Sequence, residues 1–329
     1  MAPPLCVILG PTASGKSAVA HAVARGAGAA VLSVDSMAVY RGMDIGTAKP
    51  TPAERAEVAY HGLDLAEPTE TFTVARWLAE AEAVLSDQAT AGPTVLVGGT
   101  PLYYQALFHG LFEGPPADAA FREQLQALPE AELHRRLAEV DPAAAVWIHA
   151  NDRKRLTRAL EVHHLTGAPI SGQQTQWESE SRRYPSLRFG LSWPREELNR
   201  RINARTKQML ASGWLEEVRG LLKHHGRFSS TAAEAAGYRL LAEVVQGRLS
   251  PDEAVEQIKI KTRQLAKRQM SWFRRFKEVH WLPGDAPPEE NAAIILKAWQ
   301  SAWEGPRPRG PSEDHAGLST HSAPFKKSM

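Results

Sequence analysis

The stretch that most constrains this chain is GPTASGKS, residues 10–17, which matches the spacing G-x-x-x-x-G-K-[ST]. It follows a short apolar run, LCVIL at residues 5–9, and it leads into the alanine-rich segment KSAVAHAVARGAG. We expect the apolar run to be a buried strand and the alanine-rich segment to be a helix that glycine closes at Gly26. A strand, a glycine-rich turn and a helix in this order form a loop that holds phosphate groups. The motif therefore predicts an α/β protein.

The residue types in the loop indicate which ligand it binds. Glycines allow backbone N–H groups to turn toward an anion, and the following helix adds the positive end of its dipole. Lys16 supplies an ammonium group, and Ser17 supplies a hydroxyl that is able to bind Mg²⁺. The motif thus predicts at least two linked phosphates and a metal ion, but it does not specify ATP. The predicted phosphate-binding residues of the loop are Gly10, Pro11, Thr12, Ala13, Ser14, Gly15, Lys16 and Ser17.

Further apolar runs indicate a parallel sheet of the P-loop type flanked by helices. They alternate with helical patterns such as residues 72–92, which is typical of parallel α/β folds. The predicted additional strands are residues 29–36, 94–100, 187–193 and 280–283. Asp35 and Thr100 stand at the ends of two of them. Open α/β sheets bind ligands at that edge, so we expect both residues to face the phosphate loop.

The chain changes character after Gly114. Residues 115–186 contain no convincing strand and are expected to form an inserted all-helical domain. The P-loop core would then comprise residues 1–114 and 187–303, with long helices toward its C-terminus. These helices are predicted at 195–225, 231–246 and 251–277. Residues 304–329 are rich in Pro, Gly and Ser and are expected to be a disordered tail.

Charge is balanced overall but unevenly distributed. The chain has 39 basic and 37 acidic residues, yet residues 259–277 contain eight Lys or Arg and no acidic residue. Trp272, Phe273 and Phe276 lie among these cations, and such a surface can follow phosphates and stack bases. The alternative is a core helix with a solvated basic face. Further arginines at 151–161 and 181–207 favour a large polyanionic partner.

Several classes of protein are excluded or disfavoured. The single cysteine, Cys6, excludes an intramolecular disulfide and a cysteine-rich zinc site. No run of about 18 apolar residues exists, and the N-terminus lacks the features of a signal peptide, so neither a membrane span nor secretion is expected. We therefore expect a cytoplasmic protein, with a monomer as the default.

The position of acidic residues limits the chemistry of the phosphate site. Nucleotide hydrolysis normally adds a carboxylate at the end of a second buried strand to help hold the metal. The strand at 94–100 ends in glycines and Thr100, whereas Asp35 follows a different strand. Small-molecule kinases also place a substrate-binding acid there, and a helix-capping aspartate is a third possibility. Asp35 alone does not decide between these roles.

From about residue 5 to 283 the chain resembles the tRNA dimethylallyltransferases, also called tRNA isopentenyltransferases or the IPP transferase family. The resemblance is carried by GPTASGKS, SVDSMAVYRGMDIGTAKP, HGLDL, VGGTPLYYQAL, VDPAAAVWIHANDRKRLTRALEV, MLASGWLEEVRGLL, GYR and TRQLAKRQMSWFR. It implies that the phosphates belong to dimethylallyl diphosphate. It also implies that the acceptor is the N6 amine of the adenosine 3′ of the anticodon, in tRNAs that read codons beginning with U.

The resemblance further implies roles for individual residues. Asp35 would accept a proton from the adenine amine, Thr100 would hydrogen-bond near that amine, and Arg219 would be a second cation on the diphosphate. Mg²⁺ would be held in part by Ser17. The implied tRNA contacts are Asp35, Ser36, Met37, Ala38, Thr100, Arg122, Lys154, Arg155, Leu156, Thr157, Arg158, Gly237, Tyr238, Arg239, Lys267, Arg268, Gln269, Trp272 and Arg274.

Two other functions remain open at this point. A small-molecule kinase would share the loop and Asp35, would bind ATP tightly and would use an arginine-rich lid. A non-catalytic RNA-binding protein would use the loop as a nucleotide switch, but it leaves Asp35 and Thr100 without a role.

Overall fold

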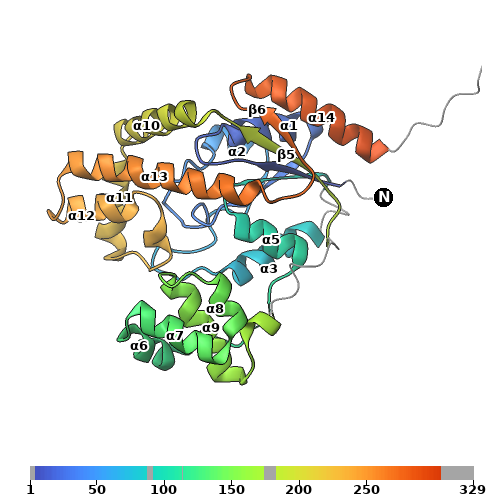
Figure 1. Cartoon of the computed structure of the whole chain (residues 1–329). Coiled ribbons are helices and arrows are strands. Elements are labelled where there is room, and N and C mark those ends of the chain that lie inside the picture. The colour runs from blue at the N-terminus through green and yellow to red at the C-terminus, as the bar shows by residue number, and fades with distance from the viewer. Residues whose placement is uncertain (1–3, 87–91, 113, 174–182, 305–329) are drawn as a thin grey trace, which may run out of the picture.

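The computed structural model describes residues 4–86, 92–112, 114–173 and 183–304. Within them, six parallel strands form one sheet in the order β3-β2-β4-β1-β5-β6, which confirms the predicted α/β fold (Figure 1). The strands are β1 (Leu5–Leu9), β2 (Ala30–Ser33), β3 (Tyr60–His61), β4 (Thr94–Gly98), β5 (Ser186–Ser192) and β6 (Val279–Pro283). Only the two-residue β3, which is too short to show a periodic pattern, was not predicted. The predicted disordered tail lies, from residue 305 onward, outside the described residues.

The central strand β1 carries apolar side chains on both faces because helices cover both sides of the sheet. Cys6 and Ile8 point to the layer formed by α1 (Lys16–Ala27) and α14 (Pro288–Glu304), where Trp299 is fully buried. In the register, Cys6 lies opposite Val95 of β4 and Leu187 of β5. The sheet therefore holds the end of β1, where the phosphate loop begins, between two neighbouring strands.

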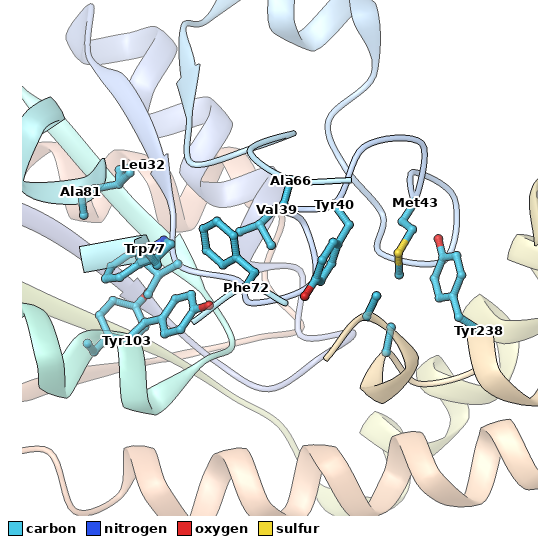
Figure 2. Close-up of a cluster of buried hydrophobic side chains, with 14 of the residues drawn as sticks. Leu32, Val39, Tyr40, Met43, Ala66, Phe72, Trp77, Ala81, Tyr103 and Tyr238 are labelled. Carbon is cyan, nitrogen blue, oxygen red and sulfur yellow. The ribbon is translucent and has the colours of Figure 1, made fainter. Parts of the chain in front are cut away.

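The other face of the sheet carries the larger hydrophobic cluster, part of which is drawn in Figure 2. Trp77 stacks on Tyr103 with ring centroids 4.4 Å apart. The Trp77 indole N–H also donates to the carbonyl of Ser33 at 3.1 Å, which fixes the end of β2. The helices that contribute to this cluster are α3 (Val74–Ser86), α5 (Pro101–His109), α11 (Trp214–His225), α12 (Tyr238–Val245) and α13 (Pro251–Phe273).

The helices that follow α5 and precede β5 lie apart from the sheet in Figure 1 and have a core of their own. Leu133, Leu137 and Leu156 are fully buried in it. Helix starts in this region are capped by side chains: Asp118, Asp141 and Asp152 each accept a backbone N–H. The helices are α6 (Ala119–Gln126), α7 (Glu130–Val140), α8 (Pro142–Trp147), α9 (Arg153–Thr166) and a 3₁₀ turn at Ile170–Gly172. The separate core supports a helical insertion, although the predicted boundaries at 115 and 186 stay a prediction.

Three predicted helices in the C-terminal half need correction. Residues 195–225 form two helices, α10 (Arg195–Ala211) and α11 (Trp214–His225), because Gly213 adopts φ 96° and breaks the first. Residues 231–246 form a 3₁₀ turn at Ala232–Glu234 followed by α12. The third helix, α13, begins at the predicted Ser250 cap, a capping box with Glu253, but ends at Phe273 instead of 277. A further helix, α2, spans Pro52–Glu57.

Two further properties concern the described helices and the single thiol. None of these helices is long and apolar enough to cross a membrane. Cys6 is fully buried in β1, and burial raises the pKa of its thiol well above the ordinary value.

Candidate active site

The phosphate loop forms a tight turn between β1 and α1. Ala13 and Gly15 adopt φ 64° and 90°, and the Ser14 N–H donates to the Pro11 carbonyl at 3.2 Å. For Ala13 this left-handed conformation costs about 1 kcal/mol, which the surrounding structure must offset. The Oγ of Ser14 is buried and has no hydrogen-bond partner in the described part of the structure. A buried hydroxyl without a partner leaves a hydrogen bond that a ligand in this turn could complete.

Side chains from three later elements hold the loop from outside. The Trp193 indole N–H donates to the Ser14 carbonyl at 3.0 Å, and Arg201 Nε donates to the Ala13 carbonyl at 3.0 Å. Gln269 Oε1 accepts the Thr12 N–H at 2.8 Å. The Arg201 guanidinium also lies 4.3 Å from the centroid of the Trp193 ring. The loop is therefore preorganised by residues more than 170 positions away in the sequence.

The loop opens into a cavity of about 1480 Å³. This volume exceeds the ~300–1,000 Å³ usual for small-ligand sites, so the cavity has room for more than one group. The ends of β1, β2 and β4 meet there, as expected for a parallel sheet. Lys16, Asp35 and Thr100 all line the cavity, which brings the predicted phosphate and catalytic residues together.

Electrostatics around the loop are dominated by cations near one carboxylate. Burial lowers the pKa of Lys16 to about 8, although the nearby Asp35 raises it and Arg205 lowers it further. Burial also lowers the pKa of Arg205, against the effect of Asp35 and together with that of Arg201. A site in which cations are desolvated and close together is stabilised by a multivalent anion.

Asp35 and Thr100 are tied into the backbone that follows β2. Asp35 Oδ1 accepts the Met37 N–H at 2.8 Å, and Thr100 Oγ1 accepts the Ser36 N–H at 3.0 Å. The Thr100 hydroxyl also contacts Ser36 Oγ at 3.3 Å. These bonds fix both side chains at the cavity wall, which is the geometry that a positioned base and its hydrogen-bonding neighbour require.

The sequence interpretation missed the arginines that the structure places at this site. Arg201 and Arg205 lie four residues apart on α10 and both line the cavity, whereas Arg219 does not line it. Arg219 is exposed on α11 and contacts Glu216 at 3.3 Å. The i, i+4 spacing in RRINAR places the two arginines on one helix face, and this was the available signal. The sequence did not reveal which face met the loop.

Helix α13 contributes one face to the cavity wall. Ile258, Thr262, Leu265, Gln269 and Trp272 line it at the 4-3-4-3 spacing of a helical stripe. Arg268 also lines the cavity, and Lys267 and Arg274 are exposed nearby on the same helix and its C-cap. The basic segment therefore combines apolar residues that face inward with exposed cations beside the cavity. Such an arrangement is compatible with an RNA-binding surface and with a core helix that has a solvated basic face.

Among the predicted tRNA contacts in the helical insertion, some side chains are exposed and others form ion pairs within the insertion. Lys154 and Arg155 are exposed, and Lys154 contacts Glu234 of the core. Arg122 and Arg158 instead pair with the fully buried Glu161 at 2.7 and 2.6 Å. Thr157 is half-buried.

Two predicted tRNA contacts are core residues. Leu156 is fully buried in the insertion core. The Tyr238 ring is also fully buried, and its hydroxyl donates to Glu217 at 2.5 Å. The predicted tRNA contact of these two residues stays a prediction, and the structure shows only that both side chains are buried. Gly237, at φ 106°, leaves no room for a Cβ beside Trp214, whereas Arg239 is exposed.

The fold and the site together define a class: this is an α/β protein with a parallel sheet and a large cavity lined by cations. The IPP transferase family model matches residues 38–276, and the Isopentenyl transferase model matches residues 3–61. The chain therefore belongs to the IPP transferase family.

Named relatives are similar along nearly the whole chain. A tRNA dimethylallyltransferase of Symbiobacterium thermophilum is 44% identical over 91% of this chain and 96% of its own length. The crystal structure of the full-length tRNA isopentenylpyrophosphate transferase from Bacillus halodurans is 34% identical, with a TM-score of 0.68 over 92% of this chain and 97% of that one. A eukaryotic dimethylallyltransferase captured acting on tRNA is 26% identical, with a TM-score of 0.72 over 85% of this chain and 73% of that one.

Proposed function

We propose that this chain transfers a dimethylallyl group from dimethylallyl diphosphate to the N6 amine of an adenosine in tRNA. The acceptor is the adenosine immediately 3′ of the anticodon, in tRNAs that read codons beginning with U. The observation that carries the proposal is the meeting of Lys16 in the phosphate loop and Asp35 at the wall of one large cavity. Membership of the IPP transferase family supplies the substrate class.

The phosphate loop serves the leaving group. As the C–O bond of the donor breaks, its electron pair passes to the diphosphate, which gains negative charge. The loop amides, Lys16 and the cavity-lining Arg205 stabilise that charge. This is the role that the resemblance gave to Arg219. We assign it to Arg201 and Arg205 because both line the cavity, whereas the role of Arg219 stays a prediction.

Asp35 serves the nucleophile. The exocyclic amine of adenine is a weak nucleophile because its lone pair is delocalised into the ring. The amine nitrogen forms the new bond to the allylic carbon and passes a proton to Asp35. Thr100 is hydrogen-bonded to Ser36, the neighbour of Asp35, and lies on the same wall of the cavity. Its hydroxyl accepts or donates a hydrogen bond beside the amine.

Magnesium fits the site only together with the donor. No group of three or more His, Cys, Asp or Glu side chains that could hold a metal ion occurs among the described residues. Mg²⁺ usually keeps several waters and takes one or two protein ligands plus phosphate oxygens. The Ser17 hydroxyl, which lines the cavity, would supply such a ligand. When bound, the ion would add positive charge beside the leaving diphosphate.

The RNA would approach over the exposed cations beside the cavity. Arg268 and Trp272 at the cavity, with Lys154 and Arg155 on the insertion, provide phosphate contacts and a stacking surface. A loop base leaves its stack at a cost of only a few kcal/mol. We propose that the protein acts as a monomer in the cytoplasm.

The test uses unmodified tRNA, Mg²⁺ and either dimethylallyl diphosphate or γ-labelled ATP, followed by nucleoside mass analysis. We expect a prenyl group on adenosine and no phosphate transfer. Phosphate transfer from ATP would instead support the small-molecule kinase. RNA binding without any chemistry would support the nucleotide-switch protein.

A further inference from the structure

Gln269 makes a contact that the reaction scheme above does not use. Its side chain is buried on the cavity face of α13. Oε1 accepts the Thr12 N–H at 2.8 Å, and Nε2 donates to the Gly99 carbonyl at 2.7 Å. A flipped amide would set N–H against N–H and oxygen against oxygen, so the two bonds define one orientation.

The two partners of Gln269 belong to opposite sides of the proposed chemistry. Thr12 lies in the loop after β1 that would hold the diphosphate. Gly99 immediately precedes Thr100, and Thr100 is hydrogen-bonded to Ser36, the neighbour of Asp35. A single side chain therefore connects the leaving-group side of the cavity with the nucleophile side.

Close packing supports this connection. A Cβ at Gly99 would clash with Gln269 Nε2, so glycine is required for the approach. Three positions earlier on α13, Ala266 packs with Ala13 of the loop and Ile202 of α10. Helix α13 thus packs against the loop close to Gln269. The position of the Gln269 amide is therefore set by a helix that is packed against the loop.

We propose that Gln269 is a positioning residue that sets the phosphate loop relative to the Asp35–Thr100 wall. The inference rests on the proposed function. Each polar atom of the Gln269 amide bonds to one backbone group, and the role assigned to Gln269 rests on these two bonds. It acts through Thr12 and Gly99, and its loss should impair the alignment of the two substrates and the affinity of the loop for an anion.

The test compares Gln269→Met, which keeps the length of the side chain but removes both hydrogen bonds, with Gln257→Met on the exposed face of the same helix. We expect Gln269→Met to lower the single-turnover rate of prenyl transfer at least tenfold at saturating donor and RNA. Its affinity for inorganic pyrophosphate, measured by calorimetry with Mg²⁺, should fall at least fivefold. Affinity for an anticodon stem-loop should stay within twofold, and Gln257→Met should match the wild type throughout.

A second variant covers the case in which Gln269→Met does not fold. Gln269→Glu keeps an oxygen toward Thr12 but sets the other against the Gly99 carbonyl, so we expect a similar loss of rate and pyrophosphate affinity. Wild-type values for rate and pyrophosphate affinity in the folded variants would overturn the inference, and so would a parallel loss of RNA affinity. Absence of prenyl transfer in the wild type would count against the proposed function alone, because pyrophosphate binding still tests Gln269.

Discussion

At the scale of single residues, the site depends on a lysine whose charge is costly to bury. The pKa of Lys16 is lowered to about 8, so the free protein loses this cation as the pH rises through that value. Diphosphate binding requires the protonated form. We expect kcat/KM for dimethylallyl diphosphate to be level below pH 7 and to fall tenfold per pH unit well above 8.

Lys16→Arg provides the control for this pH dependence. Arginine keeps its charge at all of these pH values. The residual kcat/KM of the variant should therefore show no fall between pH 7.5 and 9.5. A fall identical to that of the wild type would mean that another group titrates.

Asp35→Asn removes the proposed base but keeps the shape and the hydrogen bond to Met37. A positioned general base contributes roughly 10²–10⁴-fold. We expect the single-turnover rate to fall at least about a hundredfold, with tRNA affinity within about threefold. Asp252→Asn, on the exposed first turn of α13, is the matched control. A rate within threefold of the wild type would remove Asp35 from this role.

At the scale of elements, the sequence predicted most accurately the part of the site where a loop joins a strand directly to the next helix. The loop, β1 and α1 follow from one continuous segment, although the left-handed Gly28 closes α1 instead of the predicted Gly26. Arg205 and Gln269 were harder to assign because their roles depend on how α10 and α13 pack on the loop. Gln269 was predicted to contact tRNA, and only the packing shows that its amide is bonded to backbone on both sides.

Tyr238 illustrates the same limit on the scale of an element. An aromatic residue at the start of α12, in a segment with the family's RNA-contact pattern, was interpreted as an RNA contact. That contact stays a prediction, while the structure shows a buried ring whose hydroxyl joins Glu217 of α11 to the Gly46 N–H. A single sequence contains no information on such long-range pairing.

The exposed end of α13 is expected to bind phosphate. Lys267→Ala combined with Arg268→Ala removes two cations beside the cavity. Each lost phosphate contact lowers the slope of log affinity against log salt by about 0.7 to 0.9, so we expect a slope smaller by roughly 1.5. Filter binding of tRNA across a salt series measures it. Lys297→Ala, exposed on α14 across the sheet, should leave the slope unchanged, and an unchanged slope in the double variant would return α13 to a purely structural role.

At the scale of the whole molecule, the helical insertion has a core separate from that of the sheet. Glu161 is fully buried in the insertion and pairs with Arg122 and Arg158. Replacing Glu161 would leave Arg122 and Arg158, which are 42% and 32% exposed, without the carboxylate that holds them together. Glu161 thus organises the surface that presents the exposed Lys154 and Arg155.

Glu161→Gln should therefore weaken tRNA binding without affecting the binding of pyrophosphate. We expect a lower melting temperature and weaker tRNA binding, but pyrophosphate affinity within twofold of the wild type. Glu139→Gln, which removes an exposed partner of Arg135 on α7, should change neither binding nor melting temperature appreciably. A loss of pyrophosphate affinity in Glu161→Gln would show that the insertion and the phosphate loop are not independent.

The burial of Cys6 in the central strand has a practical consequence for experiments on this chain. The sequence contains no other cysteine, and a thiol of raised pKa that solvent does not reach reacts poorly with maleimides. A fluorophore could therefore be attached at one chosen surface position, such as Lys154→Cys, without first removing the native sulfhydryl. Labelled in this way, the protein would report through its emission whether an anticodon stem-loop binds beside the insertion.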